Sequence, residues 1–253
     1  VAHYLIIIDK HADQLTIVEK DQLHFYKQEF FVELKQLNYD EELTEERWHL
    51  YPYRSDPGVF NVDVVGGYSV QANPTNTTTR IRSNGLLTYG YAGSFLGMYL
   101  YFRDHKESGT YFDPRRDLSI SNGQIVSKSY DDGIGYDLAD VQMTFDVSFL
   151  KISLEKMPNV WGAGYHGNLI LSDKPPSYPQ IKIRAKLGKD VDLTFIHSWL
   201  SSDLVDSLNS YYVVGIPKTL GYRTIYRQKF LAAQMLEASV ANGVDVAVGE
   251  SEV

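Results

Sequence analysis

The sequence predicts a mainly β protein in which a short helical region precedes a long series of antiparallel hairpins. Apolar residues recur every three or four positions before residue 57, they alternate with polar residues after it, and turn-forming residues separate the alternating runs. A chain of 253 residues with 43% hydrophobic content is large and apolar enough to fold. We therefore expect a helical domain at 1–56 and a β domain at 57–253.

Helices are expected between Asp13 and Leu37, where charged residues occupy much of the face opposite the apolar one. The spacing predicts two short helices, followed by an acidic stretch from Asp40 to Glu46 that forms a third helix or a loop. The apolar residues of the predicted helices are Leu15, Ile17, Val18, Leu23, Tyr26, Phe30, Leu34 and Leu37.

From Phe60 onward the side chains alternate with a period of two, which is typical of strands with one apolar face. The segment 140–147 alternates without exception, and a tight connection at Ser148 links it to a second alternating run at 150–155. These two runs predict a hairpin. Further hairpins are expected for 86–102 turning near 92–94, for 181–187 and 191–199 around 188–190, and for 235–240 and 244–248 around 242–243.

Composition and charge exclude several classes of protein. The chain has no cysteine, so disulfides, thiolate metal sites and cysteine nucleophiles are ruled out. Its net charge of -8 argues against a general nucleic-acid binder, which needs a basic face. The sequence contains no uninterrupted apolar run of about 18 residues, so it predicts no transmembrane helix. The short apolar run Tyr4–Ile8 ends at Asp9 without a basic segment before it or a cleavage site after it, and so does not predict a signal peptide.

Alternation alone fits either a soluble β-sandwich or an antiparallel up-and-down transmembrane β-barrel. Three features favour the barrel: predicted strands of about ten residues, tyrosine and tryptophan near strand ends, and short turns that alternate with long polar loops. The long loops are expected at 104–117 and 200–209. The residue pattern leaves the two folds about equally favoured.

Gly162, Gly164 and Gly167 satisfy the Gly-x-Gly-x-x-Gly spacing of a dinucleotide-binding loop. A helix should follow such a loop, but Pro175 and Pro176 interrupt the segment after it. No acidic residue lies about 20 positions further on, where one would bind the ribose hydroxyls. We therefore interpret the glycines as a turn between Leu154 and Leu169 that allows close passage of backbone.

Four segments resemble the Wzi-like capsule assembly proteins, particularly Bacteroidetes-type members. The strongest is 157–173 with 178–183 (MPNVWGAGYHGNLILSD and YPQIKI), the second is 226–237 (YRQKFLAAQMLE), and weaker support comes from 60–68 and 83–86. The resemblance implies an outer-membrane β-barrel with a periplasmic helical bundle and a non-catalytic role in attaching or assembling capsular or extracellular polysaccharide. The chain departs from the family at Gln234 and His166, where histidine and arginine respectively are more usual.

The predicted barrel domain is smaller than the family's barrel. About 195 residues follow the helical region, and at roughly 20 residues per strand and connection they provide nine or ten strands. The resemblance implies about eighteen. The sequence also stops at Val253 without the aromatic residue that usually ends such barrels, so we expect the N-terminal half of a longer protein.

Cationic residues at alternate positions are the first candidate polysaccharide-binding site. Lys182, Arg184 and Lys186 share one face of a predicted strand, and with Arg80 and Arg82 they are expected to line the barrel lumen and attract acidic polysaccharide or lipopolysaccharide. The alternative is that these residues pair with lumen carboxylates and make the barrel rigid. The candidate carboxylates are Asp140, Asp146 and Asp192.

The rings of Trp161, Tyr165 and His166 are a second candidate sugar site, although a conformational role for the glycine-rich turn is the alternative. His197 is expected to be packed or interfacial rather than a ligand. The acidic residues Asp131, Asp132 and Asp137 lack EF-hand spacing and are interpreted as a polar turn.

No catalytic constellation, metal site or cofactor site is predicted. The expected location is the outer membrane. The expected partners are membrane lipid, lipopolysaccharide, acidic surface polysaccharide and other envelope proteins. An alternative function is a porin-like diffusion channel or a structural barrel subunit of a larger envelope complex.

Overall fold

A computed structural model describes residues 1–39, 45–72, 78–110, 127–161, 171, 177–213 and 221–253. The chain divides into two compact units, Val1–Leu50 and Tyr51–Val253. The first unit is helical and the second is built from strands. None of the described helices is long and apolar enough to cross a membrane.

The helical unit contains α1 (Ala2–Asp9), a 3-10 turn at Ala12–Gln14, α2 (Ile17–Glu29) and α3 (Phe31–Gln36). Helices α2 and α3 form within the region where the apolar spacing predicts two short helices. Thr16 begins α2 with a capping box, in which its side chain accepts from the backbone N–H of Glu19 and the Glu19 carboxylate accepts from the backbone N–H of Thr16. Helix α1 was not predicted, because a short apolar run does not by itself distinguish a helix from a strand.

The core of the helical unit is formed by Leu5, Leu23 and Leu34, one from each helix. A buried ion pair lies nearby: Lys27 Nζ is 2.7 Å from Asp9 Oδ2, and the Tyr39 hydroxyl donates to the same carboxylate. Burial alone raises the pKa of Asp9. The hydrogen bonds from Lys27 and Tyr39 together outweigh this effect, so the pKa of Asp9 lies below its ordinary value. Asp9 therefore joins α1 to α2 electrostatically as well as by packing.

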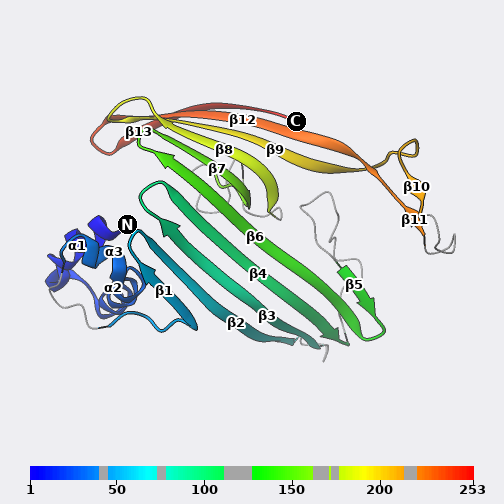
Figure 1. Ribbon diagram of the computed structural model, residues 1–253, viewed down its shortest axis with the longest axis horizontal. Coiled ribbons are helices and arrows are strands. Elements are labelled where there is room, and N and C mark those ends of the chain that lie inside the picture. Colours follow the sequence, from blue (N-terminus) through cyan, green and yellow to red (C-terminus); the bar gives the residue numbers. More distant parts are fainter. Residues whose placement is uncertain (40–44, 73–77, 111–126, 162–170, 172–176, 214–220) are drawn as a thin grey trace. The chain divides into compact units, whose positions relative to one another are not determined.

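The second unit is one 11-stranded antiparallel sheet with an additional two-stranded ribbon (Figure 1). The sheet order is β1-β2-β3-β4-β6-β7-β8-β9-β12-β13, with β5 paired to part of β6. Neighbouring strands are successive along the chain, apart from these short inserted strands, so the topology is up-and-down. The strands are β1 (Tyr51–Ser55), β2 (Gly58–Ala72), β3 (Thr78–Ala92), β4 (Leu96–Gly109), β5 (Ser127–Tyr130), β6 (Gly133–Val147), β7 (Leu150–Met157), β8 (Tyr178–Lys186), β9 (Val191–Val205), β10 (Tyr211–Tyr212), β11 (Tyr222–Arg223), β12 (Tyr226–Ala241) and β13 (Val244–Glu252).

The four hairpins expected from the sequence are confirmed. In the β6–β7 hairpin Val147 lies opposite Leu150, and in the β8–β9 hairpin Lys186 lies opposite Asp192. The β3–β4 and β12–β13 turns contain Gly93 and Gly243, both with positive φ, which suits a residue without Cβ. All these tight turns lie at one end of the sheet, which we call the turn end; the opposite end, which carries the longer connections, is the connection end.

Two expectations about strand length are wrong. Several strands have 15 residues rather than about ten, and the expected loops at 104–117 and 200–209 begin as the ends of β4 and β9. Residues 104–108 pair with both β3 and β6. The sequence predicts a loop here because polar residues occupy both faces, so hydropathy no longer alternates. The backbone hydrogen bonds between the strands nevertheless continue. Residues 111–117 lie outside the described part of the chain.

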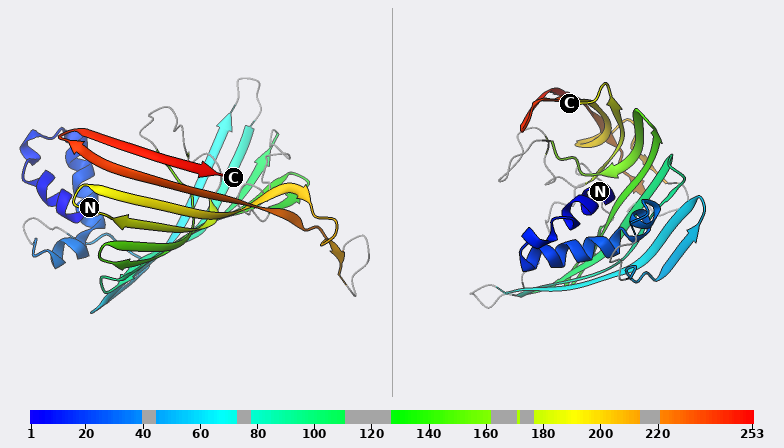
Figure 2. Two further views of the ribbon diagram at one scale, coloured as in Figure 1. Left: turned by 90° about the horizontal axis from the view of Figure 1, so that it is seen from above. Right: turned by 90° about the vertical axis from the view of Figure 1, so that its left-hand side faces the viewer.

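The sheet is curved but not closed (Figure 2). Within the described residues, the edge strands β1 and β13 each pair on one side only, so the closure of a barrel is not seen. The structure therefore shows a mainly β, antiparallel up-and-down sheet with a few small helices, as the sequence predicts.

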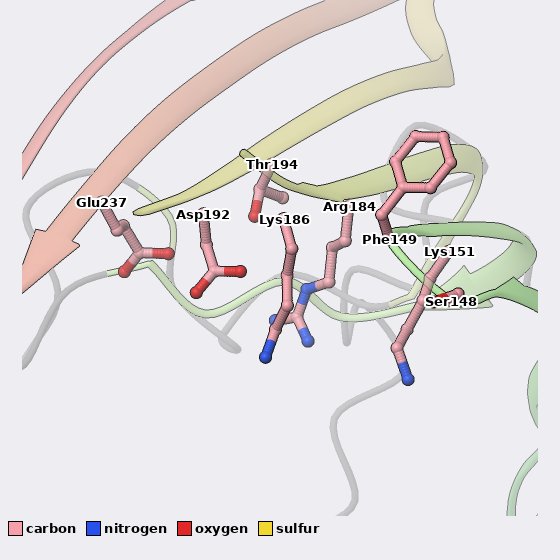
Figure 3. A pocket seen from close by; sticks show the side chains of 8 residues that line it. All are labelled: Ser148, Phe149, Lys151, Arg184, Lys186, Asp192, Thr194 and Glu237. Carbon is pink, nitrogen blue, oxygen red and sulfur yellow. The ribbon is translucent and has the colours of Figure 1, made fainter. Parts of the chain in front are cut away.

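Register divides the side chains of the sheet into two faces, because residues directly opposite each other in antiparallel strands share a face. The polar face lies inside the curve, as the side chains in Figure 3 show, and Ile196 and Ser198 of this face are fully buried. On the other face, large apolar side chains are exposed, for example Val64 at 64% and Leu154 at 45%. The apolar face includes Val62, Val64, Leu86, Leu96, Met98, Leu100, Phe102, Val141, Met143, Phe145, Val147, Ile152, Leu154, Ile181, Ile183, Leu193, Phe195, Leu236 and Val248.

Candidate functional site

The polar face of β7, β8, β9 and β12 brings together the residues of the candidate site. Lys182, Arg184 and Lys186 alternate along β8 and lie on this face, as the sequence predicts. Lys182 is opposite Ser153 of β7, and Arg184 is opposite Lys151. Their environments differ greatly, because Lys182 is nearer the connection end and the other two are nearer the turn end.

Lys182 belongs to a buried network of charges and amides. Its Nζ lies 3.3 Å from Glu155 Oε1 and 2.9 Å from Asn159 Oδ1. The Glu155 side chain is only 1% exposed. The same carboxylate accepts hydrogen bonds from Gln142 Nε2 at 2.7 Å and from Gln180 Nε2 at 2.6 Å. A buried carboxylate with one cation and two amide donors is well satisfied.

Asn159 and Gln180 extend this network across the sheet. Asn159 Nδ2 donates to Gln180 Oε1 and, at 3.0 Å, to the Tyr178 hydroxyl, while the Ser198 hydroxyl donates to Gln180 Oε1 at 3.3 Å. Asn159 is 1% exposed and Gln180 is 2% exposed, so these bonds form away from water. We call the set Gln142, Glu155, Asn159, Tyr178, Gln180, Lys182 and Ser198 the amide network.

Trp161 lies in an apolar cluster on the same face. It is 4% exposed and belongs to a core with Ile196, Ala233 and Met235, against which Leu171 packs. The Trp161 backbone N–H donates to the carbonyl of Leu171 at 2.9 Å, in an antiparallel bridge. The connection that follows β7 therefore lies on the polar face at these residues. Trp161 is packed, and its ring is not open to a sugar.

A cavity of about 270 Å³ occupies the turn end of the polar face (Figure 3). Figure 3 shows Lys186 and Arg184 projecting into it, with Asp192 and Glu237 to one side and Lys151 to the other. Its wall is formed by Ser148, Phe149, Lys151, Arg184, Lys186, Asp192, Thr194 and Glu237, and we call it the turn-end pocket.

Charge is divided within the turn-end pocket. The cations are on β7 and β8, whereas Asp192 and Glu237 lie opposite each other on β9 and β12. Lys151 pairs with Asp146 at 2.5 Å, but Arg184 and Lys186 make no ion pair or side-chain hydrogen bond to any residue that the structure describes. These two cations are available to bind an anion.

The expected pairing of the cations with Asp140, Asp146 and Asp192 is not found among the described contacts. Asp140 pairs instead with Arg103 at 2.7 Å, and Asp146 pairs with Lys151. The carboxylate that does pair with a cation of β8 is Glu155, which sequence reasoning missed. The sequence contains a signal for Glu155, because the alternation of β7 places it on the same polar face as Lys151 and Ser153.

Arg80 and Arg82 do not lie with the other predicted cations. Arg82 is opposite Tyr68 on β2 and Lys106 on β4, and it therefore shares the apolar face with Leu86 and Phe102. The expectation that these arginines line the same face as Lys182 is wrong. The reason is that β3 extends beyond the apolar part of its outer face, so polar residues there do not mark the inner face. The sequence does contain a signal for this position: Arg82 and Leu86 are four positions apart, and residues an even number of positions apart in a strand lie on the same face.

The remaining predicted site residues carry no visible site. Tyr165, His166 and the glycines 162–167 lie outside the described residues. His197 is on the apolar face, where its ring packs against Trp199 at 5.2 Å and Phe230 at 5.9 Å, as expected for a packed histidine. In the described part of the chain, no group of three histidine or acidic side chains could hold a metal ion.

Comparison with known proteins gives no relative: no protein family model, no curated protein and no solved structure matches this chain.

Proposed function

We propose that the sheet is part of the wall of an outer-membrane β-barrel and that its inner face holds acidic capsular or extracellular polysaccharide without catalysis. The observation that carries the proposal is the opposite chemistry of the two faces: the outer face is apolar and exposed, and the inner face holds unpaired cations. The periplasmic helical bundle and the role in polysaccharide attachment follow from the resemblance to the Wzi-like proteins.

The exposed apolar face supports placement in lipid. It spans neighbouring strands from β2 to β13, and side chains such as Phe145 and Val248 are exposed at 38% and 70%. A contiguous apolar surface of this kind is rare on a monomeric soluble protein. On β6 it runs from Ala139 to Val147, about nine residues, which is close to the length of a strand that crosses a bilayer at a tilt. A soluble sandwich would instead cover this face with a second sheet.

Aromatic residues mark a limit of this apolar band. Trp199 of β9 lies opposite Phe230 of β12 near the connection end, and both rings are on the apolar face. Tryptophan and other aromatic rings favour the boundary between lipid and water. Since short turns face the periplasm in such barrels, the turn end corresponds to the periplasmic side in this proposal.

The turn-end pocket supports binding of an acidic sugar. The fork of Arg184 can bind a carboxylate through two hydrogen bonds, and Lys186 adds a second positive charge. Asp192 and Glu237 can accept hydrogen bonds from sugar hydroxyls.

The test is retention of a polyuronate by the protein refolded in detergent. We expect the protein to retain alginate at low ionic strength, and the double substitution Arg184→Gln and Lys186→Gln to weaken retention about a hundredfold, at about tenfold for each lost charge-assisted contact. Lys189→Gln in the β8–β9 turn is the matched control, since it removes an exposed cation outside the pocket. Equal retention by the double variant would contradict the proposed site.

A diffusion channel is the second candidate, and the polar inner face favours it equally. The two functions differ in planar bilayers. A polysaccharide-holding barrel is expected to retain alginate, whereas a channel conducts ions and retains none. Conductance without retention would support the channel and remove the polysaccharide function.

A further inference from the structure

The unexpected position of Arg80 and Arg82 points to a second binding site. We propose that these two arginines, with Lys106 beside them, bind the phosphate group of a lipid headgroup on the outer face of the sheet. The inference rests on the proposed placement of the apolar face in lipid, but it concerns the face opposite to the polysaccharide pocket.

Register places three cations together on β3 and β4. Arg82 is directly opposite Lys106, and Arg80 is two positions along β3, opposite Ser108. All three side chains are on the apolar face and are exposed. Figure 1 shows β3 and β4 running side by side over this length.

The cations of this cluster repel one another, and a bound anion would reduce that repulsion. Like charges directly opposite each other destabilise a sheet, and this pair occurs in a chain with a net charge of -8. Among the contacts of the described residues, Arg80 and Arg82 make no ion pair and no side-chain hydrogen bond. Lys106 Nζ lies 3.7 Å from Asp132, and this ion pair is weak because both side chains are exposed. Asp104 and Asp137 lie opposite each other on the same face, two positions from Lys106 and Gly135.

The cluster lies at the depth of a headgroup. Leu86 and Phe102 are the last large apolar residues of β3 and β4 before the polar part of the same face. Arg82 lies four residues beyond Leu86, about 13 Å along the strand and about 10 Å along the membrane normal for a typical tilt. The polar headgroup layer begins at the edge of the hydrocarbon core, within reach of a long arginine side chain.

The chemistry of the cluster suits phosphate more than another anion. Two guanidinium groups two positions apart can each offer paired N–H donors to one tetrahedral phosphate. Tyr68, 68% exposed and directly opposite Arg82, adds the kind of ring that is favoured at a lipid–water boundary. A lipid surface without phosphate would leave both arginines without a partner.

The experiment counts bound lipid on the full chain in nanodiscs of phosphatidylcholine that contain a small fraction of bis-phosphorylated lipid A. Native mass spectrometry should show lipid A retained by the protein, and about tenfold less on the double variant Arg80→Gln and Arg82→Gln. Lys20→Gln with Lys189→Gln removes the same charge from two exposed positions outside both proposed sites and should leave retention unchanged. Arg80→Lys with Arg82→Lys should retain an intermediate amount, since lysine supplies charge without the fork.

Three results would overturn the inference. Undiminished lipid A on the Arg80 and Arg82 variant would exclude the site. Displacement of lipid A by millimolar inorganic phosphate would show that the cluster binds free phosphate rather than a lipid. Failure of the wild-type chain to insert into nanodiscs would remove the membrane proposal and the lipid site together, while normal insertion with no lipid A bound would remove the lipid site alone.

Discussion

Lys182 and Lys186 lie on the same face of the same strand, yet they belong to two different regions of the polar face. Lys182 joins the amide network, where Asn159 and Gln180 complete its surroundings and are at most 2% exposed. Lys186 lines the turn-end pocket opposite Asp192 and forms no ion pair among the described residues. Asn159 binds Lys182, and Trp161 packs on Ile196, which lies opposite Lys182. Burial rather than charge therefore decides that Lys182 is the structural cation.

The largest expected effect is on the buried pair. Lys182→Met leaves the Glu155 carboxylate buried with only amide donors, and we expect it to lower the free energy of unfolding by about 3–5 kcal/mol. Urea unfolding of the protein refolded in micelles measures this. Adding Glu155→Gln should recover much of the loss, since the remaining buried side chain is then uncharged. A loss below about 1 kcal/mol for Lys182→Met would mean that water reaches Glu155, and the two regions would no longer differ.

A second test removes the apolar cover. Trp161→Ala opens a void beside Ile196 and Met235 and should lower the free energy of unfolding by about 3 kcal/mol. It should also increase hydrogen exchange of the amide network, as followed by mass spectrometry of peptides from β7 and β8. Trp199→Ala, on the exposed apolar face, is the matched control and should leave that exchange unchanged. Similar exchange in both variants would contradict a covering role for Trp161.

The sequence allows the hairpins to be predicted, because the alternation and turn residues around Ser148 and Gly243 are local signals. It does not separate Lys182 from Lys186, because Glu155 and Gln180 meet Lys182 only through register between three strands. The face on which Arg82 lies could have been predicted, because Arg82 is an even number of positions from the apolar Leu86. The length of β3 could not, since polar residues occupy both faces of the strand beyond Leu86. Long-range contacts, not composition, determine the site.

The helical unit offers a second buried ion pair, Lys27–Asp9, with which to calibrate the comparison. Asp9 has a lowered pKa in the folded state, so the stability it contributes is present above its unfolded value of about 3.8 and is lost as pH falls through the folded pKa. Asp9→Asn should cost about 2–3 kcal/mol at neutral pH by leaving Lys27 buried without its carboxylate. Hydrogen exchange of α1 and α2 between pH 2 and 6 measures both effects. Acid sensitivity that persists in Asp9→Asn would assign it to another group.

The smallest effect is expected in the turn-end pocket. Lys186→Gln should change the free energy of unfolding by less than about 0.5 kcal/mol, because the lost charge is in contact with water and has no ion-pair partner in the described part of the structure. The substitution should still weaken alginate retention about tenfold, with the difference shrinking as salt is raised, since screening reduces the attraction that Lys186 provides. Unfolding in urea and retention at two salt concentrations measure the two quantities separately. A loss of more than about 2 kcal/mol would place Lys186 with Lys182 as a structural residue, and β8 would then carry one cationic row rather than two regions.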